Sequence, residues 1–227
     1  MSKRTMALVS FAILAIPQIA SAEGAFSGFY GGAGLGYGFG GQSVGADPAA
    51  PSVYDFDVKG SQISLLGGYN YQSGRFVFGI EGDANFGEAK DSQSITLNGI
   101  RYDGTANLKN YYTIRGRLGF AASENLLLFG TAGPAWGKLA STTVLISPLL
   151  GPLSPFISVN DEVSADGYIL GLGGEYNIGE RSRLRLEYNE VYFNGVDITT
   201  RSPFGPNSNF RTDNAISYVR SAVTFKF

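Results

Sequence analysis

The residues best suited to chemistry in this chain are carboxylates and arginines that recur at every second position. They are Glu81, Asp83, Arg115, Arg117, Glu175, Arg185 and Glu187. A spacing of two puts side chains on the same face of a β-strand. Paired carboxylates on one face could serve as the acid and base of a glycosidase. Carboxylates that face arginines could instead form a satisfied polar core.

The composition removes most other chemistry. The 227 residues include no histidine and no cysteine, which excludes a His-dependent triad, a disulfide framework, an iron–sulfur cluster and a Cys-ligated zinc site. The formal net charge of −2 gives no electrostatic reason to bind nucleic acid. Carboxylate, serine or tyrosine chemistry stays formally open. We predict no catalytic residue, no metal site and no cofactor.

One glycine-rich motif has a simpler explanation than ligand binding. Gly36, Gly38 and Gly41 satisfy the dinucleotide-binding pattern G-x-G-x-x-G. That pattern binds a pyrophosphate only where it joins a strand to a helix, and no helical segment follows it in this sequence. A glycine-rich strand accounts for the spacing.

The elements that would position the charged residues are β-strands. Apolar and small residues alternate with a period of two in eight stretches, a pattern typical of strands with two different faces. The stretches begin near residues 29, 63, 76, 108, 126, 168, 184 and 219. Each is about 10–14 residues long, enough for a tilted strand that crosses a membrane. The fifth, residues 126–137, is apolar on both faces, so its phase stays open.

The connections between these stretches alternate in length. Residues 72–74, 121–125 and 177–182 are short connections, and residues 40–59, 87–106, 138–164 and 194–213 are long ones. All long connections then lie at one end and both termini at the other, as in an outer-membrane barrel. Within the third long connection, the apolar, proline-containing residues 145–156 could bind a partner or fold over the barrel mouth.

Charges fall on one face of the predicted strands. The phase opposite the apolar series holds Glu81, Asp83, Lys109, Arg115, Arg117, Glu175, Arg183, Arg185, Glu187, Arg220 and Lys226. The apolar phase, which includes Leu108 and Tyr112, holds one clear charge, Glu190. This sorting fits a soluble barrel with charges outside or a membrane barrel with charges inside. The polarised connections and the aromatic residues near strand ends favour the membrane barrel. Its interior charges would either fill the lumen as ion pairs or line a narrow ion path.

The N-terminal residues predict export. A basic start at Lys3 and Arg4 precedes an apolar stretch that leads to a small-x-small site ending at Ala22. This is the pattern of a cleaved signal peptide, and the apolar stretch is shorter than the ~20 residues of a transmembrane helix. We therefore expect residues 1–22 to be removed and residues 23–227 to form one barrel domain.

Several segments of the chain resemble a known family. They are residues 29–37, 65–71, 78–83 and 114–119, together with the terminal Phe227. They resemble the outer-membrane β-barrel family of Gram-negative bacteria, and more narrowly the alphaproteobacterial porin-family surface antigens. The barrels of that group are similar to the transmembrane domain of outer membrane protein A.

The resemblance implies an all-β fold, an eight-stranded antiparallel up-and-down transmembrane β-barrel, in the outer membrane of a Gram-negative bacterium. The implied role is structural, immune-exposed or narrowly porin-like, in contact with outer-membrane lipid. Long extracellular connections would be the place for a host or surface ligand, as in an adhesin or ligand-binding barrel. The alternative from a different class is an outer-membrane enzyme that modifies lipids or cleaves proteins.

The C-terminal stretch carries a second signal. Val223, Phe225 and Phe227 place a hydrophobic residue at every second position back from the terminus. In a barrel this strand must pair with the first one, because an unpaired edge cannot face lipid. A terminal aromatic after alternating hydrophobic residues also resembles the signal read by the outer-membrane assembly machinery, which would then be a transient partner.

Overall fold

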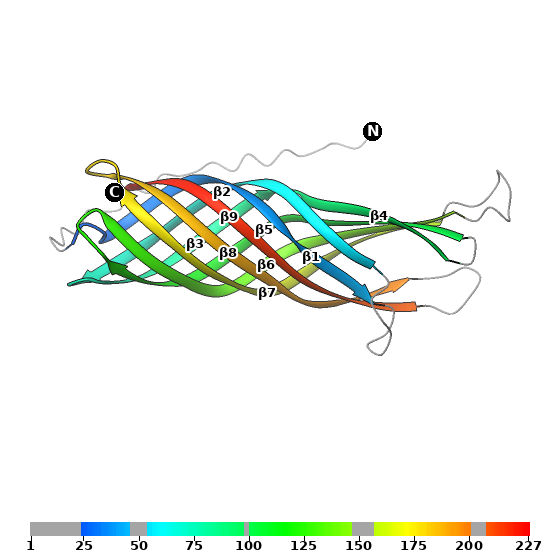
Figure 1. Cartoon of the computed structure of the whole chain (residues 1–227). Coiled ribbons are helices and arrows are strands. Elements are labelled where there is room, and N and C mark those ends of the chain that lie inside the picture. Colours follow the sequence, from blue (N-terminus) through cyan, green and yellow to red (C-terminus); the bar gives the residue numbers. More distant parts are fainter. Residues whose placement is uncertain (1–23, 46–53, 98–99, 147–156, 201–207) are drawn as a thin grey trace, which may run out of the picture.

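The protein is built from β-strands. The computed structural model describes residues 24–45, 54–97, 100–146, 157–200 and 208–227, so the predicted signal peptide lies outside the described residues. The strands are β1 (Gly28–Gly45), β2 (Tyr54–Ser73), β3 (Phe76–Gly87), β4 (Ala89–Leu97), β5 (Ile100–Ala121), β6 (Leu126–Ile146), β7 (Ile157–Asn177), β8 (Ser182–Thr200) and β9 (Ser208–Lys226), as labelled in Figure 1. Within the described ranges, we find no helix long and apolar enough to cross a membrane.

The sheet closes on itself with eight strand positions. Neighbouring strands are antiparallel, and β1 pairs with both β2 and β9. Both β3 and β4 pair with β2 on one side and β5 on the other. They therefore occupy one strand position that is interrupted at Glu88. The predicted eight-stranded antiparallel barrel is confirmed.

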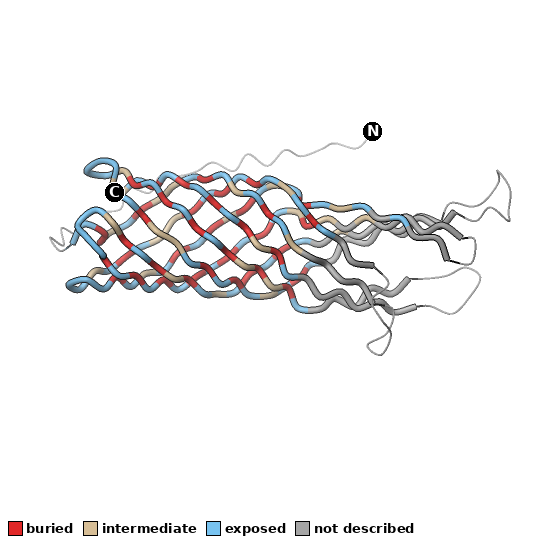
Figure 2. The backbone as a smooth tube through the Cα atoms, in the orientation of Figure 1, coloured by how far each residue is buried: buried red, intermediate tan, exposed pale blue. Residues whose placement is uncertain are grey.

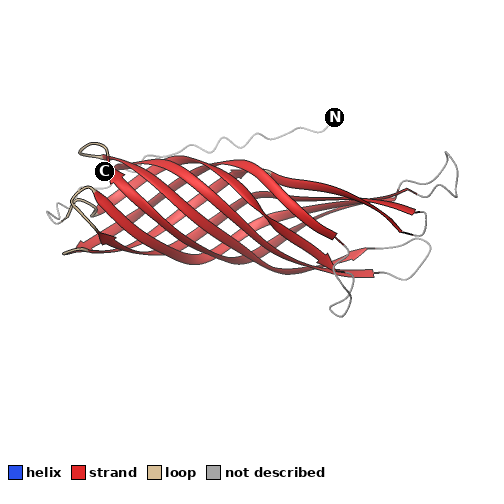
Figure 3. Cartoon of the chain, viewed as in Figure 1, coloured by secondary structure: helices blue, strands red, loops and turns tan. Residues whose placement is uncertain are grey.

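The strands are longer than the alternating stretches predicted. The longest, β5, has 22 residues, and pairing between β6 and β7 runs without a break as far as Leu145 and Ile157. Much of each predicted long connection is therefore a hairpin that extends past the barrel body at one end, as Figure 3 shows. Antiparallel pairing satisfies the backbone wherever two strands meet. Apolar alternation marks only the part of each strand with two different environments. Residues 147–156 of the proline-containing segment lie outside the described residues.

The structure corrects two predictions about which face of a strand a residue occupies. The β5–β6 register shifts between Leu108 and Tyr111, and both side chains are buried in the interior. The expected outward position of Leu108 was therefore wrong, and Lys109, expected inside, is only half-buried. A bulge inserts a residue and flips the faces beyond it, which periodicity alone does not reveal.

The structure also decides the phase of the fifth predicted strand, which is β6. Leu127 and Phe129 point inward and are buried, whereas Leu128 and Trp136 are exposed on the outer face. Buried and exposed residues alternate in this way along the barrel body (Figure 2).

The outer face of the barrel is apolar and carries aromatic residues toward both ends. At the end with the short turns, the rings of Phe76 and Phe120 lie 5.8 Å apart, edge to face. Toward the long hairpins, Tyr168 and Tyr192 stack with 4.8 Å between their centroids. Aromatic residues at both borders of an apolar band are typical of membrane barrels.

The inner face of β1 is made almost entirely of glycine. Its inward positions after Tyr30 are Gly32, Gly34, Gly36, Gly38 and Gly40. A Cβ on Gly38 would run into the ring of buried Tyr218 from the neighbouring β9. Glycine in this strand thus leaves lumen space for the large side chains that other strands send inward.

Candidate functional site

The described interior of the barrel has three layers. At the short-turn end, an apolar plug consists of Phe26, Val77, Ala121, Leu127 and Phe129, called here the short-turn plug. At the other end, the long-hairpin plug consists of Leu108, Tyr111, Ala135, Ala165, Ile169, Val191, Phe193, Ile216 and Tyr218. Between them lies the charged layer, with Glu81, Asp83, Glu175 and Glu187 against Arg115, Arg117, Arg185 and Arg220. All seven charged residues singled out from the sequence belong to this layer and are buried.

Strand register creates three of the ion pairs directly. Glu81 lies opposite Arg115 on the neighbouring strand. Glu175 lies opposite Arg185, with 2.6 Å between Oε1 and Nη2. On β8 and β9, Glu187 lies opposite Arg220, which donates to it through Nε at 2.7 Å. Directly opposed side chains on one face are the closest neighbours a sheet offers.

Other ion pairs reach across the lumen between strands that are not neighbours. Arg185 on β8 contacts Glu81 on β3 at 2.6 Å. From β5, Arg117 contacts Glu175 on β7 at 2.9 Å. The guanidinium of Arg115 also donates to the side-chain oxygen of Asn189 on β8 at 2.9 Å. The charged layer therefore fills the cross-section of the barrel and joins its walls.

Neutral polar groups add hydrogen bonds to carboxylate oxygens that arginines also contact. The hydroxyl of Tyr30 donates to Glu81 Oε2 at 2.6 Å, and Thr113 donates to Asp83 Oδ2 at 2.8 Å. Asn85 also donates to Asp83 and accepts a hydrogen bond from Ser64 at 2.7 Å. Buried charges persist only when they are paired and hydrogen-bonded in this way.

The sequence analysis did not single out Tyr30. Besides its bond to Glu81, its ring lies 5.7 Å from the guanidinium carbon of Arg117 and 5.5 Å from that of Arg185. A signal was present, because Tyr30 is the one large side chain at the inward positions between residues 30 and 40, and the others there are glycines. Only the closed barrel shows that this side chain meets charges from β3, β5 and β8.

The N-terminal segment closes the mouth at the short-turn end. Phe26 is buried in the short-turn plug, and its amide donates to Gln72 Oε1 at 3.0 Å. The backbone amide of Gln72 in turn donates to Ser27 Oγ at 2.9 Å. Arg183 donates to the carbonyl of Ala25 at 2.8 Å and lies 5.3 Å from the Phe26 ring. Residues just after the predicted cleavage site are thus part of the barrel interior.

The arrangement offers no room for acid–base chemistry at the paired carboxylates. Glu81 and Asp83 both contact Arg115, and both are buried beneath the plugs. A cavity beside Gln62, Leu108 and Tyr218 has a volume of ≈ 10 Å³, about the space of one water molecule. No group of three or more His, Cys, Asp or Glu that could hold a metal ion occurs in the described part of the chain.

The C-terminal residues named as an assembly signal lie on the outer face. Val223, Phe225 and Phe227 are all exposed there. The amide of Phe227 donates to the carbonyl of Phe29 at 3.0 Å, which extends the β1–β9 pairing to the last residue. Their side chains are free of the interior and would face lipid in a membrane.

Comparisons with known proteins agree with this geometry. A family model described as the outer membrane protein beta-barrel domain matches residues 6–216. The 31 kDa outer-membrane immunogenic protein of Brucella melitensis biotype 1 is 28% identical over 163 residues, which cover 70% of this chain and 63% of that protein. The 22 kDa outer membrane protein of Rhizobium leguminosarum bv. viciae is 29% identical over 180 residues, covering 77% and 67% respectively. The chain thus spans less than two thirds of the Brucella protein's length.

Solved structures share the architecture at low sequence identity. The outer membrane protein OprG from Pseudomonas aeruginosa aligns with a TM-score of 0.60 and 13% identity, over 90% of this chain and 98% of that one. The outer membrane protease OmpT from Escherichia coli aligns with a TM-score of 0.52 and 8% identity, over 92% and 99%. At such identities the likeness concerns the fold alone.

We expect Arg115→Leu to destabilise the barrel by about 3–5 kcal/mol, because it leaves buried Glu81 and Asp83 short of a cation. Urea unfolding of the refolded protein in lipid vesicles measures the change. Arg75→Leu is the control, because Arg75 is exposed in the turn between β2 and β3. Equal unfolding midpoints for wild type and Arg115→Leu would contradict the structural role of the charged layer.

Proposed function

This chain belongs to the outer membrane protein β-barrel family, and we propose that it serves as a closed, non-conducting barrel that displays its long hairpins at the cell surface. The protein resides in the outer membrane of a Gram-negative bacterium, like the family members it matches. The observation that carries the proposal is the three-layered interior. A structural and antigenic role needs a stable wall and exposed hairpins, and it needs no open lumen.

The interior disfavours a porin-like role. An ion that entered the lumen would meet an apolar plug at each end and a charged layer whose members are paired. Eight strands enclose a space that side chains can fill, whereas porins with 16–18 strands leave a water-filled channel. The charged layer is therefore better explained as a set of ion pairs that hold opposite strands together than as an ion path.

Surface display is supported by the shape of the molecule. The hairpins β1–β2, β4–β5, β6–β7 and β8–β9 extend at the same end, opposite the short turns (Figure 1). Outer-membrane barrels have short periplasmic turns and longer extracellular connections. We therefore place the long hairpins outside the cell, where they would form the antigenic surface. Two matched relatives carry the name outer-membrane immunogenic protein.

An enzymatic role has less support. The matched relatives carry names that describe outer-membrane and immunogenic proteins. The likeness to a protease is a likeness of fold. In this chain the carboxylates of the lumen are covered by arginines, so a catalytic role would need other residues.

In planar bilayers, the refolded protein should produce no single-channel current steps at any salt concentration, because both plugs exclude hydrated ions. A porin added to the same membrane verifies that steps are detectable. Protection of the barrel from added protease verifies that the protein has inserted. Current steps whose size scales with salt concentration would overturn the proposed closed lumen.

Single cysteines test the orientation, since the natural chain contains none. Lys90→Cys in β4 should react with a membrane-impermeant maleimide on intact cells, because Lys90 is exposed on a long hairpin. Gly179→Cys, in the short turn between β7 and β8, should react only after the outer membrane is permeabilised. The opposite labelling pattern would place the long hairpins in the periplasm.

We also propose that Phe227 is read by the outer-membrane assembly machinery. Phe227→Ala retains the backbone bond to Phe29 but removes the terminal aromatic ring. This variant should be exported and cleaved, yet reach the outer membrane at severalfold lower levels and be degraded in the periplasm. Phe76→Ala removes another exposed aromatic from the same end and should assemble normally. Equal amounts of both variants in the outer membrane would mean that Phe227 is only a lipid-facing anchor.

A further inference from the structure

Glu190 is a carboxylate on the outer face of the barrel, among apolar side chains. Glu190 lies on β8 between Tyr188 and Tyr192. These three side chains point outward on the same face of the strand as Leu184 and Leu186. The hydroxyl of Tyr188 donates to Glu190 Oε1 at 2.9 Å, and the hydroxyl of Tyr192 donates to Oε2. Both oxygens act as acceptors, as they do in an ionised carboxylate. A charge on the lipid-facing side of a barrel costs less near the membrane border, where Tyr192 lies, than at mid-depth, and a cationic partner would offset what cost remains.

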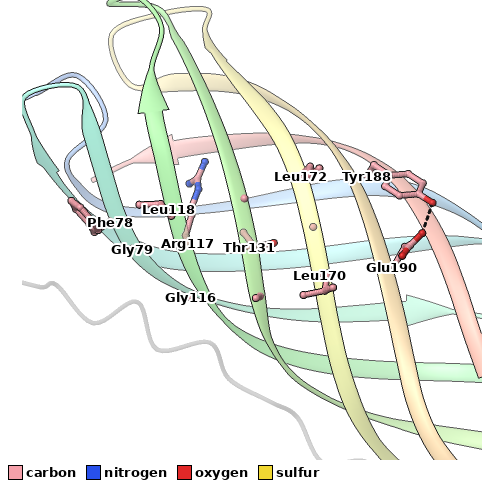
Figure 4. Close-up of a pocket in the computed structure, with 13 residues that line it drawn as sticks. Phe78, Gly79, Gly116, Arg117, Leu118, Thr131, Leu170, Leu172, Tyr188 and Glu190 are labelled. Carbon is pink, nitrogen blue, oxygen red and sulfur yellow. Dashed lines mark hydrogen bonds between the residues drawn. The ribbon is translucent and has the colours of Figure 1, made fainter.

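A groove on the outer face begins beside this carboxylate. Its volume is ≈ 940 Å³, and its lining residues come from β3, β5, β6, β7 and β8 (Figure 4). Small outward residues, Gly116, Gly130 and Ala132, form its floor, and Phe78 and Leu172 are among the larger side chains that flank them. Neighbouring strands lie about 4.8 Å apart, so the groove runs for roughly 19 Å. This path bends around the barrel wall, so an acyl chain as long as one leaflet, about 15 Å of hydrocarbon, would cover most of it only by curving with the wall.

We propose that the groove binds a membrane lipid whose acyl chain lies over Gly116 and Ala132 and whose ammonium group pairs with Glu190. The apolar floor and flanks match a hydrocarbon chain. The carboxylate at the edge matches a cationic donor, because the two tyrosine hydroxyls beside it carry no charge and leave its negative charge unbalanced. A lipid with an acyl chain and an ammonium group can cover the apolar groove and neutralise Glu190 at the same time.

A second copy of the chain fits the groove less well. A two-fold axis through the groove would bring Glu190 of one protomer against the Phe78 side of the other. The outward side chains of β3 at that side are Phe76, Phe78 and Ile80, which offer no donor to a carboxylate. An amino lipid supplies the donor that this pairing lacks.

Native mass spectrometry of the refolded barrel tests the proposal. The protein is released from detergent micelles that contain phosphatidylethanolamine, phosphatidylcholine or phosphatidylglycerol with identical acyl chains. Wild type should retain about five times more phosphatidylethanolamine than either other lipid, the ratio expected for one charge contact at a membrane surface. Glu190→Gln, which keeps the side-chain size, should reduce its retention to the level of phosphatidylcholine.

Two further variants test the groove itself. A Cβ at Gly116 or at Gly82 would meet one backbone oxygen at 3.8 Å, so both positions accept a side chain. Gly116→Leu fills the floor of the groove and should lower retention of all three lipids. Gly82→Leu adds the same side chain on the outer face beyond the groove lining and should retain lipid like wild type.

Three results would overturn the proposal. Equal retention of phosphatidylethanolamine and phosphatidylcholine by wild type would remove the role of the ammonium group. Equal losses in Gly116→Leu and Gly82→Leu would mean that lipid adheres to the whole outer face. A dimer of the wild-type chain that excludes lipid would identify a second copy as the occupant. Heat-modifiable gel mobility verifies that each variant has folded before it is measured.

Discussion

The pairing of β1 with β9 is the contact on which the rest of the structure depends. In hydrocarbon no water is available for a free backbone edge, so a membrane sheet must close. Here the closure runs from Tyr30 opposite Lys226 to Gly45 opposite Arg211, and the Phe227 amide extends it by one further bond. Closure also brings the first and last strands of the chain together, so the barrel wall is complete only after both have been made.

Closure with eight strand positions sets the width of the lumen, and the width decides what can fill it. The charged layer has four arginines and four carboxylates, so the charges balance within it. Glycines on the inner face of β1 leave room that the side chains of Gln62 and Tyr218 from the neighbouring strands occupy. The two apolar plugs then shield the layer from water at both ends. Ion pairs with so little competing solvent cross-link strands that are far apart in the sequence.

The outer face is apolar where the lumen is charged, because the outer face is in contact with lipid. Most outward side chains of the barrel body are apolar, and the hydroxyl-capped Glu190 departs from that rule beside a groove with a small-residue floor. Past the apolar band, pairing continues into the long hairpins. One set of strands therefore provides a membrane wall at one level and paired hairpins that extend beyond it at the other.

Much of this protein could be predicted from the order of its residues. A period of two in hydrophobicity is a local property, so it revealed the eight strand positions and the face that carries Glu81, Arg115 and Glu175. Register is not local. The bulge after Leu108, the inward turn of Leu127 and Phe129, and the pairing of Arg117 with Glu175 across the lumen depend on how distant strands align. The placement of Phe26 and Tyr30 in the interior and the groove beside Glu190 likewise exist only once the sheet has closed, because each is assembled from strands that the sequence keeps apart.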